Sequence, residues 1–258
     1  MNRPSRMKYK RVTRRIAAGA LFLVTLLAGC RLWQAPIYPR SDYASGVRPL
    51  RILFIGNSLT YYNDLPGLVG QLSAGEAQPL RVDSVTLFNA TLQDHWTITA
   101  ARKHLERGLD GDTWDFVVLQ EYSTRPAESP TATLADYRLW ANEIHRLGPA
   151  KIVLFENWTH EQQSDLLARM RDTYTHVQRE IGGDIALIGD AWERCGKQHP
   201  EIKLYDDDKH PTVAGTYLAA CMLYKTVYRK PATGLPTVLP GLKLAPDIAA
   251  AMQHVADD

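Results

Sequence analysis

The chain has 258 residues, of which 45% are hydrophobic and 22% are charged, and 30 Lys and Arg against 28 Asp and Glu give a formal net charge of +2. This composition is typical of a globular chain and excludes a disordered or fibrous one. Seven of the basic residues precede residue 30 in a stretch without acidic residues, so the remainder has 23 basic against 28 acidic residues, a net charge of −5. An acidic body argues against a nucleic-acid partner, because phosphate binding demands a basic face.

The first 29 residues are predicted to be a signal peptide. Ile16–Gly29 is an uncharged run of 14 residues. As a helix it would span about 21 Å, which is shorter than the roughly 30 Å hydrocarbon core of a bilayer. The run leads into Leu27-Ala28-Gly29-Cys30, which resembles the lipobox of bacterial lipoproteins. That resemblance implies cleavage before Cys30 and diacylation of its thiol, and the alternative is a short transmembrane anchor with an incidental Cys.

Residues 30–47 are predicted to tether the lipid to a folded domain. They lack hydrophobic periodicity and contain Pro36, Pro39 and Gly46, which is typical of a linker. The absence of Asp after the lipidated Cys, where Arg31 stands, is similar to lipoproteins of the outer membrane. The folded domain is then expected to cover residues 48–258.

The domain is predicted to be a single α/β unit. Short apolar runs predict five buried strands, at Leu50–Ile55, Val82–Phe88, Phe116–Leu119, Lys151–Phe155 and Ile185–Ile188. Helical spacing of apolar residues separates most of them, at Leu65–Leu72, Leu134–Ile144, Leu167–Ile181 and Val213–Tyr224. This alternation favours a parallel sheet with helices on both faces and an active site at the carboxyl ends of the strands.

Two short segments near such strand ends have the residues of nucleophilic catalysis. Ser58 follows Gly56-Asn57 at the turn from the first strand into a helix, where a serine hydroxyl is exposed. Asp207 precedes His210 by three residues at the start of the last long helix. That spacing lets the carboxylate bind His210 Nδ1–H while Nε2 faces a nucleophile. The competing interpretation is that Ser58 and His210 are helix N-caps and that Asp206–Asp208 is a solvated turn.

Together the two segments resemble the SGNH (GDSL-like) hydrolase superfamily. Gly56-Asn57-Ser58-Leu59 is similar to its first block, in the Gly-Asn-Ser variant, and Asp207 to Pro211 matches its Asp-x-x-His-Pro block. The resemblance spans about residues 50 to 227. It implies a flavodoxin-like, three-layer α/β/α sandwich with a five-stranded parallel sheet. It also implies ester hydrolysis without a metal or an organic cofactor.

By this resemblance Ser58 is the nucleophile, His210 the general base and then acid, and Asp207 the residue that orients His210. The tetrahedral oxyanion needs donors, and the Ser58 backbone N–H is one. The family's second donor is a Gly N–H, but no Gly follows the second strand here, so the donor would be the N–H of Asn89 or Ala90. Gln120 replaces the usual Asn as the expected third donor.

Four further residues follow strand ends and are candidate substrate contacts. Glu121 is expected to support the site or touch the substrate, and Asn157 lies just beyond the fourth strand. Trp158 and His160 follow it and belong either to the rim of the site or, for the aromatic ring, to the core. The Asp206–Asp208 run together with His210 is a weak alternative metal site, but a metal is not expected, because divalent ions need converging ligands and the sequence shows no such convergence.

The sequence therefore predicts an exported serine esterase, anchored through Cys30 on the periplasmic face of the outer membrane. Its partners would be the membrane and a small-molecule or glycan ester, with O-acetylated carbohydrate as the favoured substrate. The alternatives are a lipase, thioesterase or acyltransferase of the same fold, or a non-catalytic glycan-binding lipoprotein. Cys195 and Cys221 either form a disulfide in an oxidising compartment or pack as free thiols.

Overall fold

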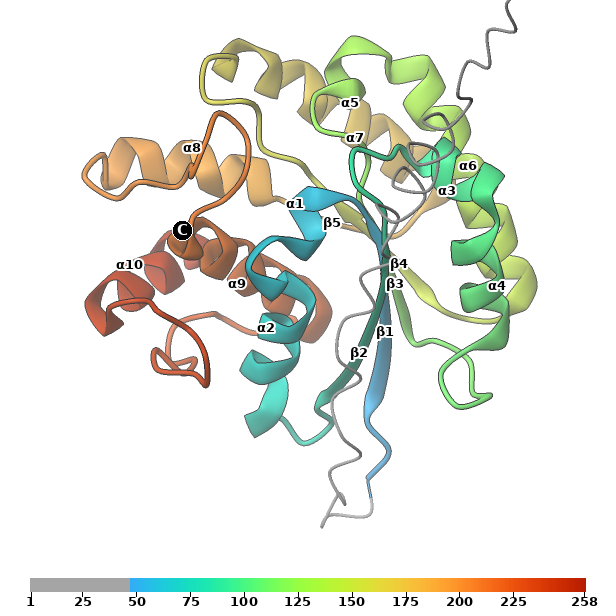
Figure 1. Cartoon of the computed structure of the whole chain (residues 1–258), viewed down its shortest axis with the longest axis horizontal. Helices are drawn as coiled ribbons and strands as arrows, with labels where there is room; N and C mark the ends of the chain where they lie inside the picture. The colour runs from blue at the N-terminus through green and yellow to red at the C-terminus, as the bar shows by residue number, and fades with distance from the viewer. Residues whose placement is uncertain (1–46) are drawn as a thin grey trace, which may run out of the picture. The chain divides into compact units, whose positions relative to one another are not determined.

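The computed structural model describes residues 47–258, which form an α/β domain around one sheet (Figure 1). All strand pairs are parallel and the order is β2-β1-β3-β4-β5. The prediction of a five-stranded parallel sheet is confirmed, with strands β1 Leu50–Gly56, β2 Leu80–Thr86, β3 Phe116–Leu119, β4 Lys151–Phe155 and β5 Asp184–Ala186.

Two predicted strand ends are wrong, and turns explain both. β2 ends at Thr86, because Leu87 accepts a hydrogen bond from the Ala90 N–H at 3.4 Å and closes a turn through Asn89, which has φ +57°. Phe88, predicted as part of the strand, is instead 76% exposed. β5 ends at Ala186, because helix α8 begins at Ile188.

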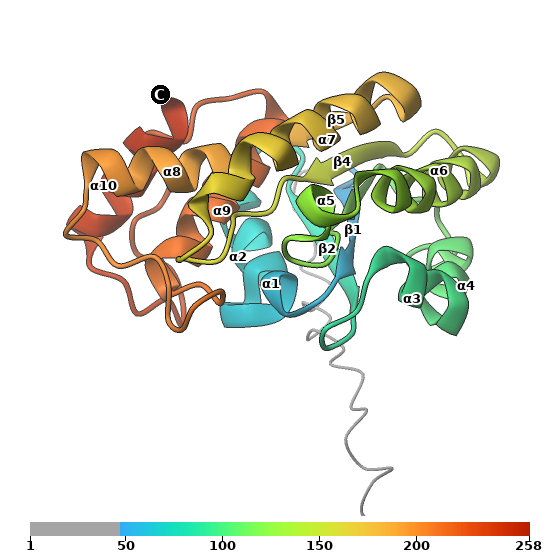
Figure 2. The same cartoon turned by 90° about the horizontal axis from the view of Figure 1, so that it is seen from above.

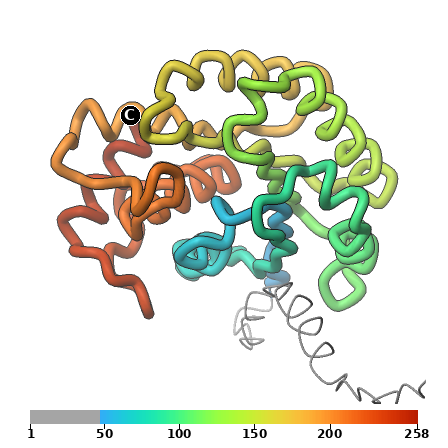
Figure 3. The backbone as a smooth tube through the Cα atoms, turned by 45° about the horizontal axis from the view of Figure 1, so that its top comes forward, coloured from blue at the N-terminus to red at the C-terminus, as the bar shows by residue number. Residues whose placement is uncertain are grey.

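Helices cover both faces of the sheet, as Figure 2 shows. One layer contains α2, α8, α9 and α10, and the other contains α3, α4, α6 and α7. The bounds are α1 Ser58–Tyr61, α2 Leu65–Leu72, α3 Leu92–Ile98, α4 Ala100–Arg107, α5 Arg125–Glu128, α6 Pro130–Leu147, α7 Leu167–Ile181, α8 Ile188–Gln198, α9 Val213–Tyr228 and α10 Pro246–Asp257, with 3-10 turns at Tyr62–Asp64, Ser73–Gly75 and Ser164–Leu166. Figure 3 shows the last helices, in orange and red, beside the cyan segment that holds α2.

Alternate residues of each central strand enter opposite cores. In β1, Ile52 and Phe54 pack into the layer of α2 and α9, whereas Leu53 and Ile55 pack into the layer of α6 and α7. All four are fully buried, which is the pattern of a parallel strand covered on both faces. The apolar packing fixes the sheet register, and thereby the positions of the polar residues that follow each strand.

Cys195 and Cys221 are both free and buried, so the disulfide alternative is wrong. Cys195 on α8 and Cys221 on α9 belong to the same core, where Cys195 Sγ lies 3.9 Å from the sulfur of Met252. The predicted signal peptide, Cys30 and the tether up to residue 46 lie outside the described residues. Between residues 47 and 258, no helix combines the length and the apolar character needed to cross a membrane.

Candidate active site

Ser58, His210 and Asp207 form a hydrogen-bonded chain at the carboxyl edge of the sheet. Ser58 Oγ lies 2.9 Å from His210 Nε2, and His210 Nδ1 lies 2.7 Å from Asp207 Oδ2. Ser58 is 7% exposed and His210 is 8% exposed, so the reacting atoms are sheltered but not sealed. The structure therefore brings together the three residues that the two sequence blocks single out, in the order that general-base activation of a serine requires.

Asn57 holds the turn that presents Ser58. Its Oδ1 caps helix α1 by accepting the Leu59 N–H at 3.1 Å, and its Nδ2 donates to the carbonyl oxygen of Ala90 at 2.9 Å. Its backbone N–H donates to Gln120 Oε1 at 2.8 Å. An Asp at this position would accept the cap but could not donate to Ala90, which is a physical reason for Asn in this chain.

The loop before α9 fixes His210. Asp207 Oδ1 accepts the backbone N–H groups of Lys209 and His210 at 2.8 and 2.7 Å, while its other oxygen binds the imidazole. Partial burial acts to raise the pKa of Asp207, but the hydrogen bonds from His210 and from these N–H groups lower it well below its usual range. The carboxylate is therefore charged at neutral pH and able to hold the Nδ1–H tautomer.

Sequence reasoning missed two residues that position this loop. The ring of Tyr62 stacks on His210, with centroids 4.4 Å apart and planes at 12°. Asn63 Nδ2 donates to the carbonyl oxygen of Pro211 and to Thr216 Oγ1, both at 2.9 Å. These contacts join segments that lie about 150 residues apart, so no local pattern signals them. The left-handed φ of +50° at Asn63 is a conformation that Asn tolerates better than most residues.

Gln120 does not point to the oxyanion as predicted. Its Oε1 accepts from the Asn57 N–H and, at 3.0 Å, from Thr60 Oγ1. Its amide group donates to the carbonyl oxygen of Glu121 and, at 3.5 Å, to Asn157 Oδ1. Since these bonds occupy both ends of the buried amide, the prediction that Gln120 is the third donor is wrong, and the residue instead positions the turn of Ser58.

Two of the backbone N–H groups predicted as oxyanion donors, those of Ser58 and Ala90, belong to turns that meet at Asn57. The Ser58 N–H stands at the first position of α1, where a backbone N–H has no intrahelical acceptor. The turn with Asn89 and Ala90 is tied to Asn57 through the Ala90 carbonyl. The Ala90 N–H itself makes only the long 3.4 Å bond to Leu87, so little would be lost on redirecting it to a bound oxyanion.

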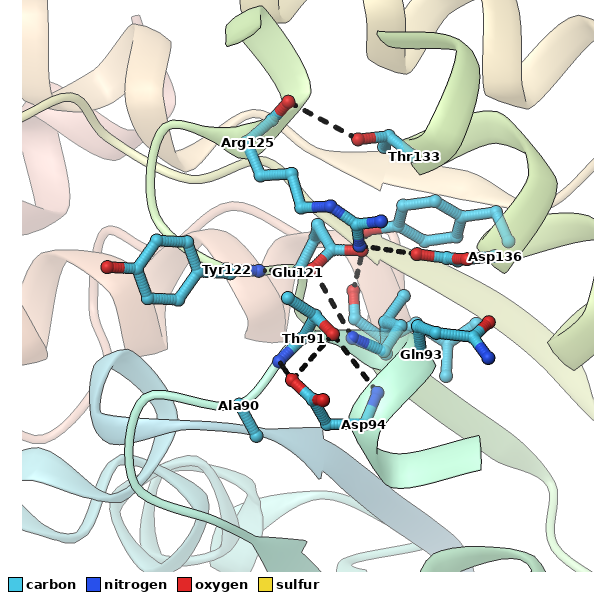
Figure 4. Close-up of polar contacts among 12 residues, drawn as sticks. Ala90, Thr91, Gln93, Asp94, Glu121, Tyr122, Arg125, Thr133 and Asp136 are labelled. Atoms are coloured by element: carbon cyan, nitrogen blue, oxygen red, sulfur yellow. Dashed lines mark hydrogen bonds and ion pairs between the residues drawn. The ribbon is translucent and has the colours of Figure 1, made fainter. Parts of the chain in front are cut away.

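Glu121 is a buried structural carboxylate and not a substrate contact, which corrects that part of its prediction. It is completely buried and accepts the N–H groups of Leu92 at 3.3 Å and Tyr122 at 2.6 Å. Arg125 Nη1 lies 3.0 Å from it and also pairs with Asp136 (Figure 4). Burial raises the pKa of Glu121 to about 7, against the effect of these donors. The residue thus ties the end of β3 to the start of α3.

The other predicted substrate contacts divide between the core and the rim. Asn157 is fully buried and donates to the carbonyl oxygens of Glu121 and Ser123 at 2.8 and 2.7 Å. Trp158 is buried and stacks on Trp192, with ring centroids 4.1 Å apart. Neither side chain is exposed, so the prediction for Asn157 is wrong, and of the two alternatives for Trp158 the core position is confirmed. His160 is partly exposed at the edge of the sheet.

The raised pKa of Glu156, the residue after β4, should make the stability of the protein depend on pH. Burial and the neighbouring Asp190 carboxylate raise the pKa of Glu156 to about 8, against N–H donors from Gly189 and Asp190. The folded chain then holds more protons than the unfolded chain between the ordinary carboxyl range and pH 8, so the free energy of unfolding falls as pH rises there, by up to about 1.4 kcal/mol per pH unit. We expect Glu156→Gln to make this fall shallower.

Urea unfolding of wild type and Glu156→Gln at several pH values between 5 and 8 would measure this slope. The raised pKa of Glu121 acts in the same direction, so the fall is reduced and not abolished. Glu161→Gln, in the exposed loop after β4, is the matched control and should leave the slope unchanged. Identical slopes for wild type and Glu156→Gln would contradict the assignment.

Comparisons with known proteins match this chain to solved structures. No protein-family model and no curated protein matches it. A putative SGNH hydrolase from Slackia heliotrinireducens is 29% identical with a TM-score of 0.58, over 69% of this chain and 99% of that one. A DUF4886 family protein from Bacteroides uniformis is 17% identical with a TM-score of 0.68, over 81% and 93%. A catalytic mutant of an acetylxylan esterase from Geobacillus stearothermophilus is 17% identical with a TM-score of 0.51, over 71% and 94%. The three-layer α/β/α fold and the resemblance predicted from the two blocks are confirmed.

Proposed function

We propose that this SGNH hydrolase is a serine esterase in which Ser58, His210 and Asp207 act as the catalytic triad. The observation that carries the proposal is the continuous chain of hydrogen bonds from Ser58 Oγ through His210 to Asp207. A serine that merely capped a helix would need no imidazole at its hydroxyl. In α1 the capping is done by Asn57, which leaves the Ser58 hydroxyl to His210.

The geometry supports a two-step acyl transfer. His210 Nε2 takes the proton of Ser58 as Oγ attacks the ester carbonyl, and the Asp207 carboxylate stabilises the imidazolium that forms. The Ser58 N–H and the Ala90 N–H are the proposed donors to the oxyanion. His210 then returns the proton to the leaving alcohol, and water resolves the acyl-enzyme by the same steps in reverse order.

We assign the substrate class to O-acyl esters, with O-acetylated carbohydrate favoured. This choice rests on analogy with the family and on the envelope location that the lipobox predicts. The match to an acetylxylan esterase supports only that this fold can host such a reaction. Hydrolysis of acetylated xylo-oligosaccharides compared with p-nitrophenyl esters of two to twelve acyl carbons would test the class. A preference for long acyl chains on simple alcohols would replace it with a lipase.

A fluorophosphonate probe tests the triad without knowledge of the substrate. The purified chain should form a covalent adduct on Ser58, located by peptide mass spectrometry, because the probe reacts with serines activated by a general base. The adduct should be absent from His210→Ala. A folded protein that takes no label on Ser58 would refute the esterase and favour a glycan-binding lipoprotein.

We also propose that the mature chain begins at Cys30 and is held by acyl chains on that residue, facing the periplasm from the outer membrane. The support is the lipobox Leu27-Ala28-Gly29-Cys30. Cells fed an alkyne-tagged fatty acid should label the wild-type chain, and Cys30→Ser should abolish both this label and sedimentation with membranes. The matched control Cys195→Ser changes a buried thiol and should keep the label. Equal labelling of wild type and Cys30→Ser would exclude the anchor.

A further inference from the structure

A second serine at the same edge of the sheet contacts a second imidazole. Ser123 Oγ lies 2.7 Å from His160 Nε2, and His160 Nδ1 lies 3.7 Å from Asp208 Oδ2. The groups follow one another in the same order as in Ser58, His210 and Asp207: a serine hydroxyl, the imidazole Nε2 and Nδ1, and a carboxylate. Ser123 is 5% exposed, which is close to the value for Ser58. Neither Ser123 nor Asp208 has a role in the chemistry proposed above.

The three residues come from separate segments that hydrogen bonds hold together. Ser123 lies in the connection from β3 to α5, where its carbonyl oxygen accepts from Asn157 Nδ2 at 2.7 Å. His160 lies in the connection after β4, and the neighbouring Glu161 N–H donates to the carbonyl oxygen of Asp208 at 2.8 Å. Consecutive aspartates therefore serve different histidines, Asp207 facing His210 and Asp208 facing His160.

The backbone at Ser123 is strained. Its φ is +22°, a region that few residues other than glycine adopt. Such a conformation costs about 1 to 3 kcal/mol and persists where the surrounding structure enforces it, commonly at functional sites. Ser123 lies four residues beyond the end of β3, in the turn that leads into α5. Strain and the imidazole contact are independent observations that point to the same hydroxyl.

We propose that Ser123, His160 and Asp208 form a second nucleophilic site that accepts carboxylic esters with small acyl groups. His160 Nε2 takes the Ser123 proton as Oγ bonds to the carbonyl carbon, the carbon–oxygen bond to the alcohol breaks, and the proton passes to the departing alcohol. Water then attacks the acyl-Ser123 ester and regenerates the hydroxyl, with its proton relayed through His160. The near-complete burial of Ser123 restricts the acyl group to a small one.

The second site should be slower than the first. The 3.7 Å separation of His160 from Asp208 exceeds a hydrogen bond, and the Asp208 side chain is two-thirds exposed, at 66%. Both features weaken the stabilisation of the imidazolium that forms. Because loss of the orienting carboxylate costs acyl-transfer enzymes about 10⁴-fold, we expect Ser123 to react about 10³-fold more slowly than Ser58.

Fluorophosphonate labelling of the full-length Ser58→Ala protein tests the proposal. Peptide mass spectrometry should find one adduct, on Ser123. The adduct should disappear in Ser58→Ala combined with Ser123→Gly, which removes the hydroxyl while suiting the positive φ, and in Ser58→Ala combined with His160→Gln. The matched control Ser129→Ala, an exposed serine between α5 and α6, should keep it. In chains with both serines, Asp208→Asn should slow Ser123 more than Ser58, and Asp207→Asn the reverse.

Two outcomes would overturn the second site. One is a Ser58→Ala protein with wild-type circular dichroism that takes no adduct on Ser123. The other is an adduct on Ser123 that forms equally fast after His160→Gln, which would mean reactivity without a base. Each serine is scored by its own peptide, so the second site and the esterase proposed above fail independently of each other.

Discussion

Ser58→Ala should lower kcat/KM for a small acyl ester by about 10³-fold, down to the rate expected from Ser123, because removing a triad serine costs up to about 10⁶-fold at that serine itself. The methyl group offers no nucleophile, and His210 is left 2.9 Å from where Oγ stood with no proton to take. Initial rates on p-nitrophenyl acetate, with active-site concentration from probe labelling of the wild type, measure the loss. Turnover that remains should come from Ser123 and vanish in the double variant with Ser123→Gly.

His210→Ala should cost about as much as Ser58→Ala, and the double variant little more, because the members of a triad act as a unit. Asp207→Asn should slow the labelling of Ser58 by about 10⁴-fold, which is a smaller loss at Ser58 than in either of the other two variants. Its Oδ1 can still accept the N–H groups of Lys209 and His210, but its amide would face Nδ1 and favour the wrong imidazole tautomer. Unchanged rates in folded Ser58→Ala would refute the mechanism, whereas losses that simply add would show that the two residues act separately.

The parts of this site that the sequence could predict are those whose residues lie close together in the chain. Ser58 follows a strand and a Gly, and Asp207 stands three residues before His210, so each fragment has its own local geometry. The buried strands are likewise apolar runs whose carboxyl ends must meet at one edge. These features required no knowledge of which side chains touch across the fold, and for that reason the structure and the sequence agree on them.

The wrong predictions concern residues whose role depends on distant partners. Gln120 has the right chemistry for an oxyanion donor, but its amide is occupied by Asn57, Thr60 and its own neighbours. For Trp158 the sequence left the rim and the core open, because the choice depends on a ring more than thirty residues away, against which it packs. The contact between Ser123 and His160 is equally long-range, and neither residue stands in a motif.

Gly56→Ala should lower both stability and activity, although it leaves the side chains of the triad intact. A Cβ at Gly56 would collide with Thr60 Oγ1 and lie 2.6 Å from Gln120 Oε1 and 2.9 Å from Gln120 Cβ. These side chains cannot move away freely, because both are buried. Thr60 is hydrogen-bonded to Gln120, and Gln120 accepts a hydrogen bond from the Asn57 N–H. Overpacking of this kind costs about 1 to 3 kcal/mol of stability.

The same collision should reduce activity beyond the loss of stability. Relief requires Gln120 to move, which releases the Asn57 N–H and shifts the turn that presents Ser58. A displacement of about 1 Å at a reacting atom costs about 10²-fold in rate, so kcat/KM should fall by about 10- to 100-fold in protein that is still folded at 25 °C. Urea unfolding and ester hydrolysis on the same preparation separate the two effects.

Gly196→Ala is the matched control, because a Cβ there meets nothing within 4 Å on the exposed face of α8. Removing the flexibility of a glycine inside a helix should raise stability by about 0.5 to 1 kcal/mol and leave kcat/KM unchanged. The two substitutions add the same methyl group. A lower free energy of unfolding in Gly56→Ala and a higher one in Gly196→Ala would therefore show that the loss arises from the collision at the turn before Ser58. Equal behaviour of the two variants would mean that Gln120 moves without consequence and that the position of Ser58 is set by other contacts.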